Sequence, residues 1–127
     1  MYDVKLVLDQ LLNVKEALLH IIDRTSSIKQ VDDFTTTPYG ADMLDVTTIK
    51  LMAVGEEIKK IDKRTKGRLL ILYPNIDWEI IISLRNLIAH EYFEIDPQEI
   101  FLTVQNRVYP LLTTIEQMIE NLKKNDT

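Results

Sequence analysis

Four side chains that could take part in phosphodiester chemistry lie within residues 85–92 of this 127-residue chain: Arg85, Asn86, His90 and Tyr92. Arginine presents a permanently charged, planar fork that suits phosphate oxygens. Histidine can accept or donate a proton near neutral pH, and His90 is one of only two histidines in the chain. An arginine and a histidine together form a minimal set for cleaving a phosphodiester bond without a metal ion.

The same residues also have an ordinary structural interpretation. A helix often carries an arginine and a histidine at its polar edge, where they are hydrated or form ion pairs, here with Glu91 or Glu94. Without the motif spacing, Tyr92 is best interpreted as an aromatic residue at a helix end that packs with Phe93 and Ile95. The residue types by themselves favour the structural role over the catalytic one.

The spacing of these residues resembles the signature of a known family. An arginine, a polar residue, three further residues, a histidine, one residue and a tyrosine follow in that order, just ahead of the helix-capping pair Asp96-Pro97. This pattern is similar to that of the HEPN superfamily, and within it to the HepT-like toxins. Residues 73–78 and 54–58 also have counterparts in that family, so the resemblance covers nearly the whole chain.

The resemblance implies a helical bundle with ribonuclease activity. HepT-like toxins are the ribonuclease halves of two-gene systems whose antitoxin is a minimal nucleotidyltransferase, and HEPN ribonucleases generally dimerise around a shared cleft. Carried over to this chain, the family pattern makes Arg85, Asn86 and His90 catalytic and makes Tyr92 the residue to which the antitoxin can attach AMP. The implied partners are an RNA substrate, a cognate nucleotidyltransferase and a second copy of the chain.

The composition is that of an ordinary globular protein. Hydrophobic residues make up 46% and charged residues 28% of the chain, and the length predicts a single domain over residues 1–127. The chain has no cysteine, which excludes disulfides and thiolate metal sites. Its longest apolar runs are far shorter than a membrane span. We therefore expect a cytoplasmic protein without a membrane partner.

The charge is acidic overall and basic in one place. A net charge of −5 argues against a general nucleic-acid coat protein, which would carry a wide basic surface. Residues 58–68 are the exception, with six basic residues and one acidic residue. Within them, Lys59, Lys60, Lys63 and Arg64 could contact RNA phosphates. They could equally complement the negative end of a helix dipole, and the two roles are compatible.

Helical periodicity and capping signals predict four main helices. They are expected at residues 3–24, at 37–64, from Asp77 through the motif, and from Asp96-Pro97 onward. The connection at 25–37 can hold one short helical turn, and a further short helical piece can occur at 66–72. No strand-like alternation of useful length is present.

Four helices with short connections predict an all-α fold, an antiparallel four-helix bundle with short additional helical turns. Pro110 lies inside the last helix, where proline removes a backbone donor and crowds the preceding turn, so we expect a kink there. Gly55 lies in the middle of the second helix, at a cost of roughly 1 kcal/mol relative to alanine. That cost indicates a close backbone crossing at Gly55.

Helix geometry limits how the motif can act. Each residue of a regular helix turns the chain by about 100°, so Arg85 and Tyr92 share a face, whereas Arg85 and His90 diverge by well over a right angle. One undistorted helix therefore cannot aim Arg85 and His90 at a single phosphate from the same side. Either the helix is distorted near residues 89–90, or two copies of the chain share the site, which predicts a homodimer.

These observations favour a metal-independent RNA endonuclease that acts as a toxin. His90 would be the general base or acid, Arg85 would stabilise charge on phosphorus, and Asn86 would hold the phosphate or orient His90. We expect no cofactor, and one histidine in the motif is a poor set of metal ligands. The alternative is a non-catalytic, dimeric helical module that binds a nucleotide or a nucleotidyltransferase partner, which the acidic net charge modestly favours.

Overall fold

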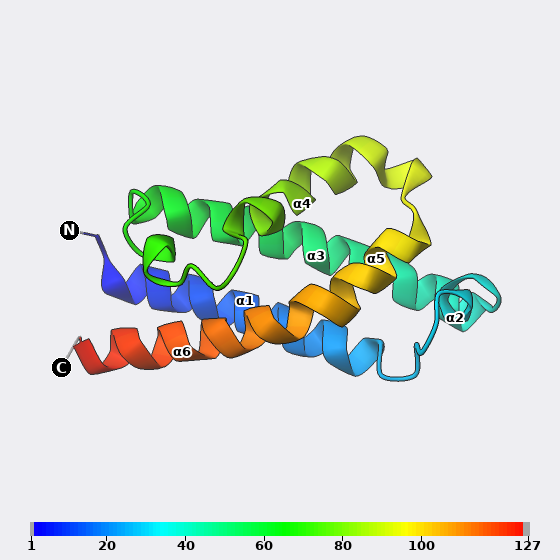
Figure 1. The fold of residues 1–127 in the computed structure, drawn as a ribbon, viewed down its shortest axis with the longest axis horizontal. Coiled ribbons are helices and arrows are strands. Elements are labelled where there is room, and N and C mark those ends of the chain that lie inside the picture. The colour runs from blue at the N-terminus through cyan, green and yellow to red at the C-terminus, as the bar shows by residue number, and fades with distance from the viewer. Residues whose placement is uncertain (1, 126–127) are drawn as a thin grey trace.

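A computed structural model describes residues 2–125, and this part of the chain contains helices and connections but no strand (Figure 1). The α-helices are α1 (Val4–Arg24), α2 (Asp32–Thr35), α3 (Pro38–Arg64), α4 (Trp78–Glu91), α5 (Pro97–Thr103) and α6 (Tyr109–Asn125). The shorter elements are the 3-10 turns η1 (Leu70–Leu72) and η2 (Tyr92–Glu94) and the π-helical turn η3 (Val104–Val108). The all-α prediction is confirmed.

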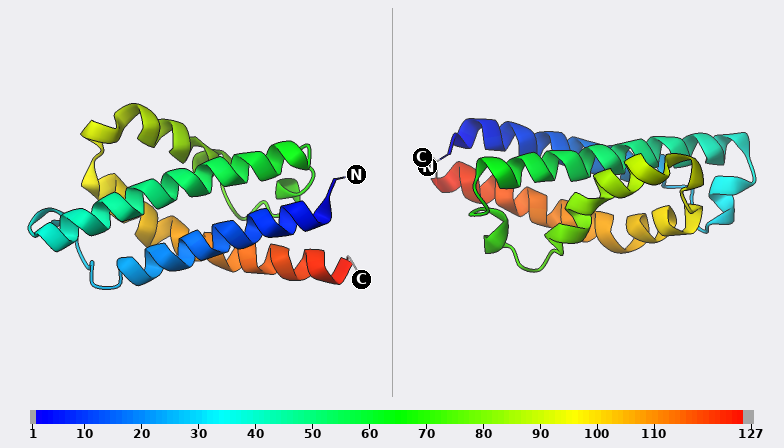
Figure 2. Two further views of the ribbon diagram at one scale, coloured as in Figure 1. Left: turned by 180° about the vertical axis from the view of Figure 1, so that it is seen from behind. Right: turned by 90° about the horizontal axis from the view of Figure 1, so that it is seen from above.

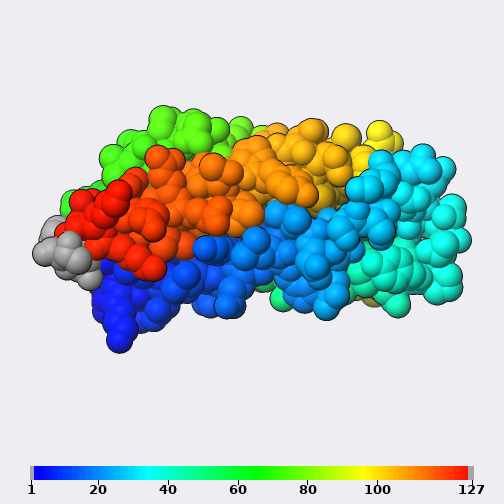
Figure 3. All heavy atoms as spheres, turned by 90° about the horizontal axis from the view of Figure 1, so that it is seen from below, coloured from blue at the N-terminus to red at the C-terminus, as the bar shows by residue number. Residues whose placement is uncertain are grey.

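The long helices form an antiparallel bundle. Helices α1 and α4 run in one direction, and α3 and the α5–α6 segment run in the other, so that the two ends of the chain lie at the same end of the bundle (Figures 1 and 2). Helices α1 and α6 lie side by side along one face, and α2 lies at the far end (Figure 3). No helix within residues 2–125 is long and apolar enough to cross a membrane.

The core lies where α1 meets α3 and α6. Buried side chains recur on α1 at helical spacing, as the sequence pattern predicts, and they face buried stripes on the two neighbouring helices. The main members are Val7, Leu11, Val14, Leu18 and Ile21 of α1, Leu51, Val54, Ile58 and Ile61 of α3, and Leu111, Ile115, Met118 and Leu122 of α6. Burial of these stripes holds α1, α3 and α6 together, and α4 packs against α3.

Side-chain caps begin each of the four main helical segments. Asp3, Thr37, Asp77 and Asp96 each accept a hydrogen bond from a backbone N–H two or three residues later, at distances of 2.9–3.3 Å. A cap satisfies a backbone donor that has no partner inside the helix. The helix starts predicted at Thr37, Asp77 and Asp96 are confirmed.

The close crossing predicted at Gly55 is confirmed. A Cβ atom placed on Gly55 would lie 2.8 Å from the carbonyl oxygen of Ile81 and 3.0 Å from the backbone nitrogen of Arg85. The backbone of α4 therefore rests directly against α3 at this point. Because any side chain here would push the two helices apart, glycine is the residue that permits the contact.

Pro110 is accommodated by an irregular turn. The π-helical turn Val104–Val108 lies immediately before Tyr109 and Pro110, and the helix changes direction between α5 and α6 (Figure 1). Proline lacks the N–H that would bond to the carbonyl four residues earlier, and its ring crowds that carbonyl, so a widened turn relieves both problems. The sequence predicts the bend, and the structure places its cause in the turn preceding the proline.

Candidate functional site

The motif residues lie on α4 and on the turn that follows it. Arg85, Asn86 and His90 belong to α4, and Tyr92 opens η2. All four side chains are exposed. Helix α4 continues to Glu91, so the distortion near residues 89–90 that could have brought Arg85 and His90 together within one chain is not found.

Arg85 is held by one residue from its own helix and one from α3. Its Nη1 atom donates to Oδ1 of Asn86 at 3.0 Å, and its Nε atom lies 3.2 Å from Oε2 of Glu56. The side chains of Arg85 and Glu56 are 47% and 39% exposed, so this is a surface ion pair. A guanidinium group has five N–H donors, and these two contacts use only two of its nitrogens, which leaves donors for an oxyanion.

The crossing at Gly55 explains why Glu56 reaches Arg85. The α4 backbone at Ile81 and Arg85 touches α3 at Gly55, and Glu56 is the next residue along α3. The ion pair expected from the sequence involved Glu91 or Glu94, whereas the structure pairs Arg85 with Glu56. A glycine at a predicted helix crossing indicates that its neighbour lies beside a second helix, but the residue opposite Glu56 depends on the register of the crossing, which the sequence does not specify.

His90 is isolated from Arg85. No hydrogen bond or ion pair of His90 is found among residues 2–125. His90 follows Arg85 by five residues, so on a regular helix the two side chains point in directions about 140° apart. A single copy of the chain therefore presents an oriented arginine on one side of α4 and an unpaired histidine on another.

Tyr92 lies beyond the regular helix. Glu91 has φ −118° and ψ 22°, so the helical rotation that would place Tyr92 on the face of Arg85 does not extend to it. The ring of Tyr92 packs edge-to-face on Phe93, with ring centroids 5.4 Å apart. Tyr92 is 42% exposed and Phe93 is 97% exposed. The predicted packing of Tyr92 with Phe93 is confirmed, and it leaves the tyrosine open to solvent.

The predicted basic contacts lie on the other side of Arg85 from His90. Lys59, Lys60, Lys63 and Arg64 are all exposed in the last two turns of α3, and Arg64 donates from Nε to Oε1 of Gln10 at 3.2 Å. Because α3 and α4 are antiparallel, these residues extend from Glu56 toward the beginning of α4 (Figure 2). The basic residues therefore lie toward the beginning of α4, away from the end that carries His90, and Arg64 faces α1.

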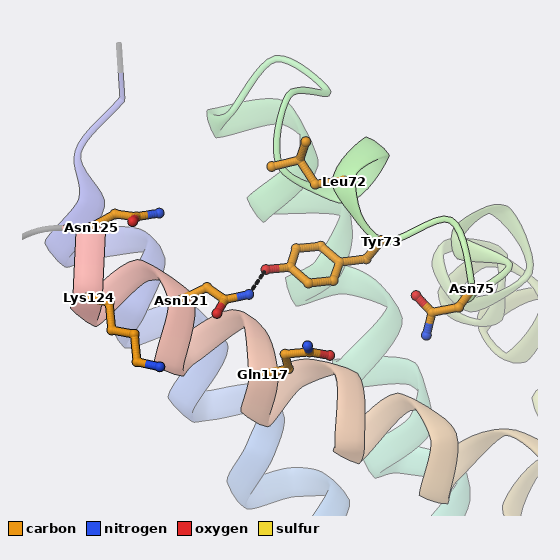
Figure 4. A pocket seen from close by; sticks show the side chains of 7 residues that line it. All are labelled: Leu72, Tyr73, Asn75, Gln117, Asn121, Lys124 and Asn125. Atoms are coloured by element: carbon orange, nitrogen blue, oxygen red, sulfur yellow. Dashed lines mark hydrogen bonds between the residues drawn. The ribbon is translucent and has the colours of Figure 1, made fainter.

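A polar hollow lies outside the motif region. It has a volume of about 520 Å³ and lies between the segment after η1 and the end of α6, where Nδ2 of Asn121 donates to the hydroxyl of Tyr73 at 2.8 Å (Figure 4). No motif residue lines it. Within the described chain, no group of three or more His, Cys, Asp or Glu side chains is placed to hold a metal ion.

A family model described as "Ribonuclease HepT-like" matches residues 14–118. The chain belongs to the HepT-like ribonuclease family. The match covers α3 and α4 completely and therefore includes Glu56, the basic residues of α3 and the whole motif. The family assignment agrees with the resemblance found in the sequence and supports a ribonuclease function.

Curated relatives of this HepT-like chain come from Methanocaldococcus jannaschii. One, named "Gamma-glutamylcyclotransferase and putative RNase MJ0434", is 25% identical over 97% of this chain and 50% of its own length. Another, named "Putative RNase MJ0127", is 26% identical over 88% of this chain and 94% of its own length. The chain thus spans about half the length of the first relative. No solved structure matches the chain significantly.

Proposed function

We propose that this HepT-like protein is a metal-independent RNA endonuclease and the toxin of a toxin–antitoxin pair. The observation that carries the proposal is the environment of Arg85, an exposed guanidinium held by Glu56 and Asn86 whose other donors have no partner among residues 2–125. Such a group suits the charge that develops on a phosphate during cleavage. His90, exposed and without a partner in the described chain, supplies the proton-transfer group.

The proposed reaction is an internal transesterification. His90 removes the proton of an RNA 2′-hydroxyl, and the 2′-oxygen attacks the adjacent phosphorus. The bond from phosphorus to the 5′-oxygen breaks, and a protonated imidazole returns a proton to that oxygen. Arg85 stabilises the charge on the pentavalent phosphorus, and Asn86 positions the phosphate. The products are a 2′,3′-cyclic phosphate and a 5′-hydroxyl, and DNA is resistant because it lacks the nucleophile.

The active assembly in this proposal is a homodimer in which Arg85 of one copy acts with His90 of the other. The support is the wide angle between these side chains on an undistorted α4. Exposed apolar residues beside the motif suit a second copy: Leu87 and Leu102 line a groove of about 250 Å³, and Phe93 is 97% exposed. A second copy of the chain, related to the first by a two-fold axis near the end of α4, would cover this surface.

Incubation of the purified protein with RNA, with and without EDTA, tests the enzymatic proposal. We expect cleavage to persist in EDTA and to fall by about 100- to 10,000-fold in His90→Ala, with unchanged helical content by circular dichroism. The new ends should carry a 2′,3′-cyclic phosphate. Strict dependence on a divalent ion, or full activity of His90→Ala, would overturn the mechanism.

The antitoxin in this proposal is a minimal nucleotidyltransferase that attaches AMP to Tyr92. The tyrosine is 42% exposed, and its ring is braced by Phe93, so a partner enzyme can reach its hydroxyl. The adduct would place a phosphate and bulk at the end of α4. Co-expression should raise the intact mass of the wild type by one AMP and leave Tyr92→Phe unmodified. Modification that persists in Tyr92→Phe would place the acceptor elsewhere.

The second candidate function is a non-catalytic dimeric module that binds a nucleotide or a nucleotidyltransferase. It is favoured by the carboxylate of Glu56, which already neutralises Arg85, and by the net charge of −5. The two candidates differ in the RNA assay. Specific nucleotide or nucleotidyltransferase binding without any RNA cleavage would favour the module, whereas cleavage that depends on His90 would favour the enzyme.

A further inference from the structure

An apolar hollow adjoins the same helix as the motif. It has a volume of about 390 Å³ and lies between the end of α3, the η1 segment and the first turns of α4. Leu70, Trp78 and Ile82 contribute its apolar surface, and Ile71 at its edge is 73% exposed. Asp62 and Glu79, which carry carboxylates, are also among the residues that line it. The hollow therefore combines an aromatic ring and aliphatic walls with two hydrogen-bond acceptors.

Ile82, which lines the hollow, precedes Arg85 by one turn on α4. Residues three and four apart on a helix lie on one face, so Ile82 is followed on its face by Arg85 and Asn86. Along the axis, Arg85 is about 4.5 Å from Ile82 and about 9 Å from Glu79. A nucleotide next to one whose phosphate contacts Arg85 would reach the hollow without leaving the surface of α4.

Two lysines of α3 share the helix face of Glu56, the residue that pairs with Arg85. On α3, Lys59 and Lys63 follow Glu56 at three- and seven-residue spacing, so they form a row on the side of α3 that bears the ion pair with Arg85. Both are exposed. RNA phosphates can follow this row while a base turns inward, because single-stranded bases are recognised by stacking and by hydrogen bonds to their edges.

We propose that this hollow is a nucleobase subsite that prefers a base with an exocyclic amino group over uracil. The proposal rests on the proposed ribonuclease function and names the substrate class of that same surface. Trp78 and the aliphatic walls would contact the plane of the base, and the carboxylate of Glu79 would accept a hydrogen bond from its amino group. Uracil presents a carbonyl oxygen where cytosine has its amino group, and a carboxylate repels it.

Intrinsic fluorescence can measure this binding because Trp78 is the only tryptophan in the chain. The probes are short 2′-O-methyl oligonucleotides of cytosine and of uracil, which lack the nucleophilic hydroxyl and report binding without cleavage. We expect the cytosine oligomer to change the emission of Trp78 and to bind roughly tenfold more tightly than the uracil oligomer. Equal affinity for the two, or no change in emission with either, would overturn the subsite.

A substitution pair locates the preference. Glu79→Gln should bring the two affinities to within about twofold of each other, because an amide both donates and accepts hydrogen bonds. Glu120→Gln, which removes the same charge on an exposed part of α6 outside the hollow, should keep the preference. Circular dichroism verifies that both variants fold. A preference that survives Glu79→Gln, or that is lost equally in Glu120→Gln, would contradict the assignment.

Two further outcomes separate this proposal from its alternatives. Emission of Trp78 that depends on protein concentration and not on oligonucleotide would assign the hollow to contact between copies and would overturn the subsite. Loss of cleavage in His90→Ala together with equal binding of cytosine and uracil would uphold the ribonuclease and reject the subsite. Base-selective binding by a protein without RNA cleavage would uphold the subsite and reject the enzyme.

Discussion

The two ends of α4 differ in how the rest of the chain holds them. At its beginning, Asp77 caps the helix, Nε1 of Trp78 donates to the carbonyl of Tyr73 at 2.8 Å, and Ile81 is only 2% exposed. Past the buried Ile88, every side chain from residue 89 to residue 94 is exposed. One end is fixed by hydrogen bonds and backbone contact, and the other projects from the bundle.

Arg85 lies at the boundary between these two regions. Its backbone touches α3 at Gly55 and its side chain pairs with Glu56, so the tertiary structure determines its position. His90 lies in the projecting region, where the described chain offers it no partner. The comparison indicates that one chain can orient the phosphate-binding group by itself, while the proton-transfer group depends on what covers the end of α4.

The largest effect is expected from mixing two inactive variants. Arg85→Ala and His90→Ala should each lower RNA cleavage by about 100- to 10,000-fold. If Arg85 and His90 of different copies share a site, a heterodimer of the two variants keeps one intact site out of two and should recover about half of the wild-type rate. Two affinity tags allow the heterodimer to be purified. A heterodimer as inactive as its parents would place both residues of a site in one chain.

The anchored end can be tested by overpacking its crossing. Gly55→Leu should lower the free energy of unfolding by about 1–3 kcal/mol, because a side chain there meets the backbone of α4. The control is Ala53→Leu, at an exposed position of the same helix, which should change stability little. Thermal unfolding measures both. Equal melting temperatures for the wild type and Gly55→Leu would mean that the crossing is absent.

The projecting end can be tested by removing its most exposed aromatic residue. Phe93→Ser should leave the melting temperature of the monomer unchanged, since the side chain is 97% exposed, and should raise the dimer dissociation constant by about tenfold or more. Tyr39→Ser serves as the control because Tyr39 is 55% exposed at the start of α3. Analytical ultracentrifugation gives the constants. Unaltered dimerisation in Phe93→Ser would direct the search for the interface elsewhere.

The smallest effect on stability and activity is expected from a change at Glu56, which pairs with Arg85 at the boundary between the two ends of α4. Glu56→Gln removes a surface ion pair, so stability should change by no more than about 1 kcal/mol. The substitution also removes a negative charge beside the proposed phosphate site, which should lower KM for RNA by up to about fivefold and leave kcat nearly unchanged. Glu57→Gln is the matched control, since Glu57 accepts from Gln10 and Asn13 and not from Arg85. A large loss of kcat in Glu56→Gln would assign it a part in the chemistry.

The sequence by itself determined the local structure and the identity of the motif. Caps such as Thr37 and Asp77 act on donors within three residues, so the starts of α3 and α4 could be predicted without knowledge of the fold. The consequences of Gly55 and Pro110 were equally readable, because a missing side chain or a missing N–H acts on the backbone around it. The spacing of the motif residues was likewise sufficient to predict the family, because it is a property of the sequence alone.

Only the tertiary structure decided what the motif residues contact. Glu56 and Arg85 are 29 positions apart, and their pairing depends on how closely and in which register α3 and α4 cross. The same packing places Asp62, near the end of α3, beside Trp78 and Glu79 at the beginning of α4. Capping and helix formation involve neighbours in sequence, whereas an ion pair between helices depends on packing over the whole core, which no local pattern specifies.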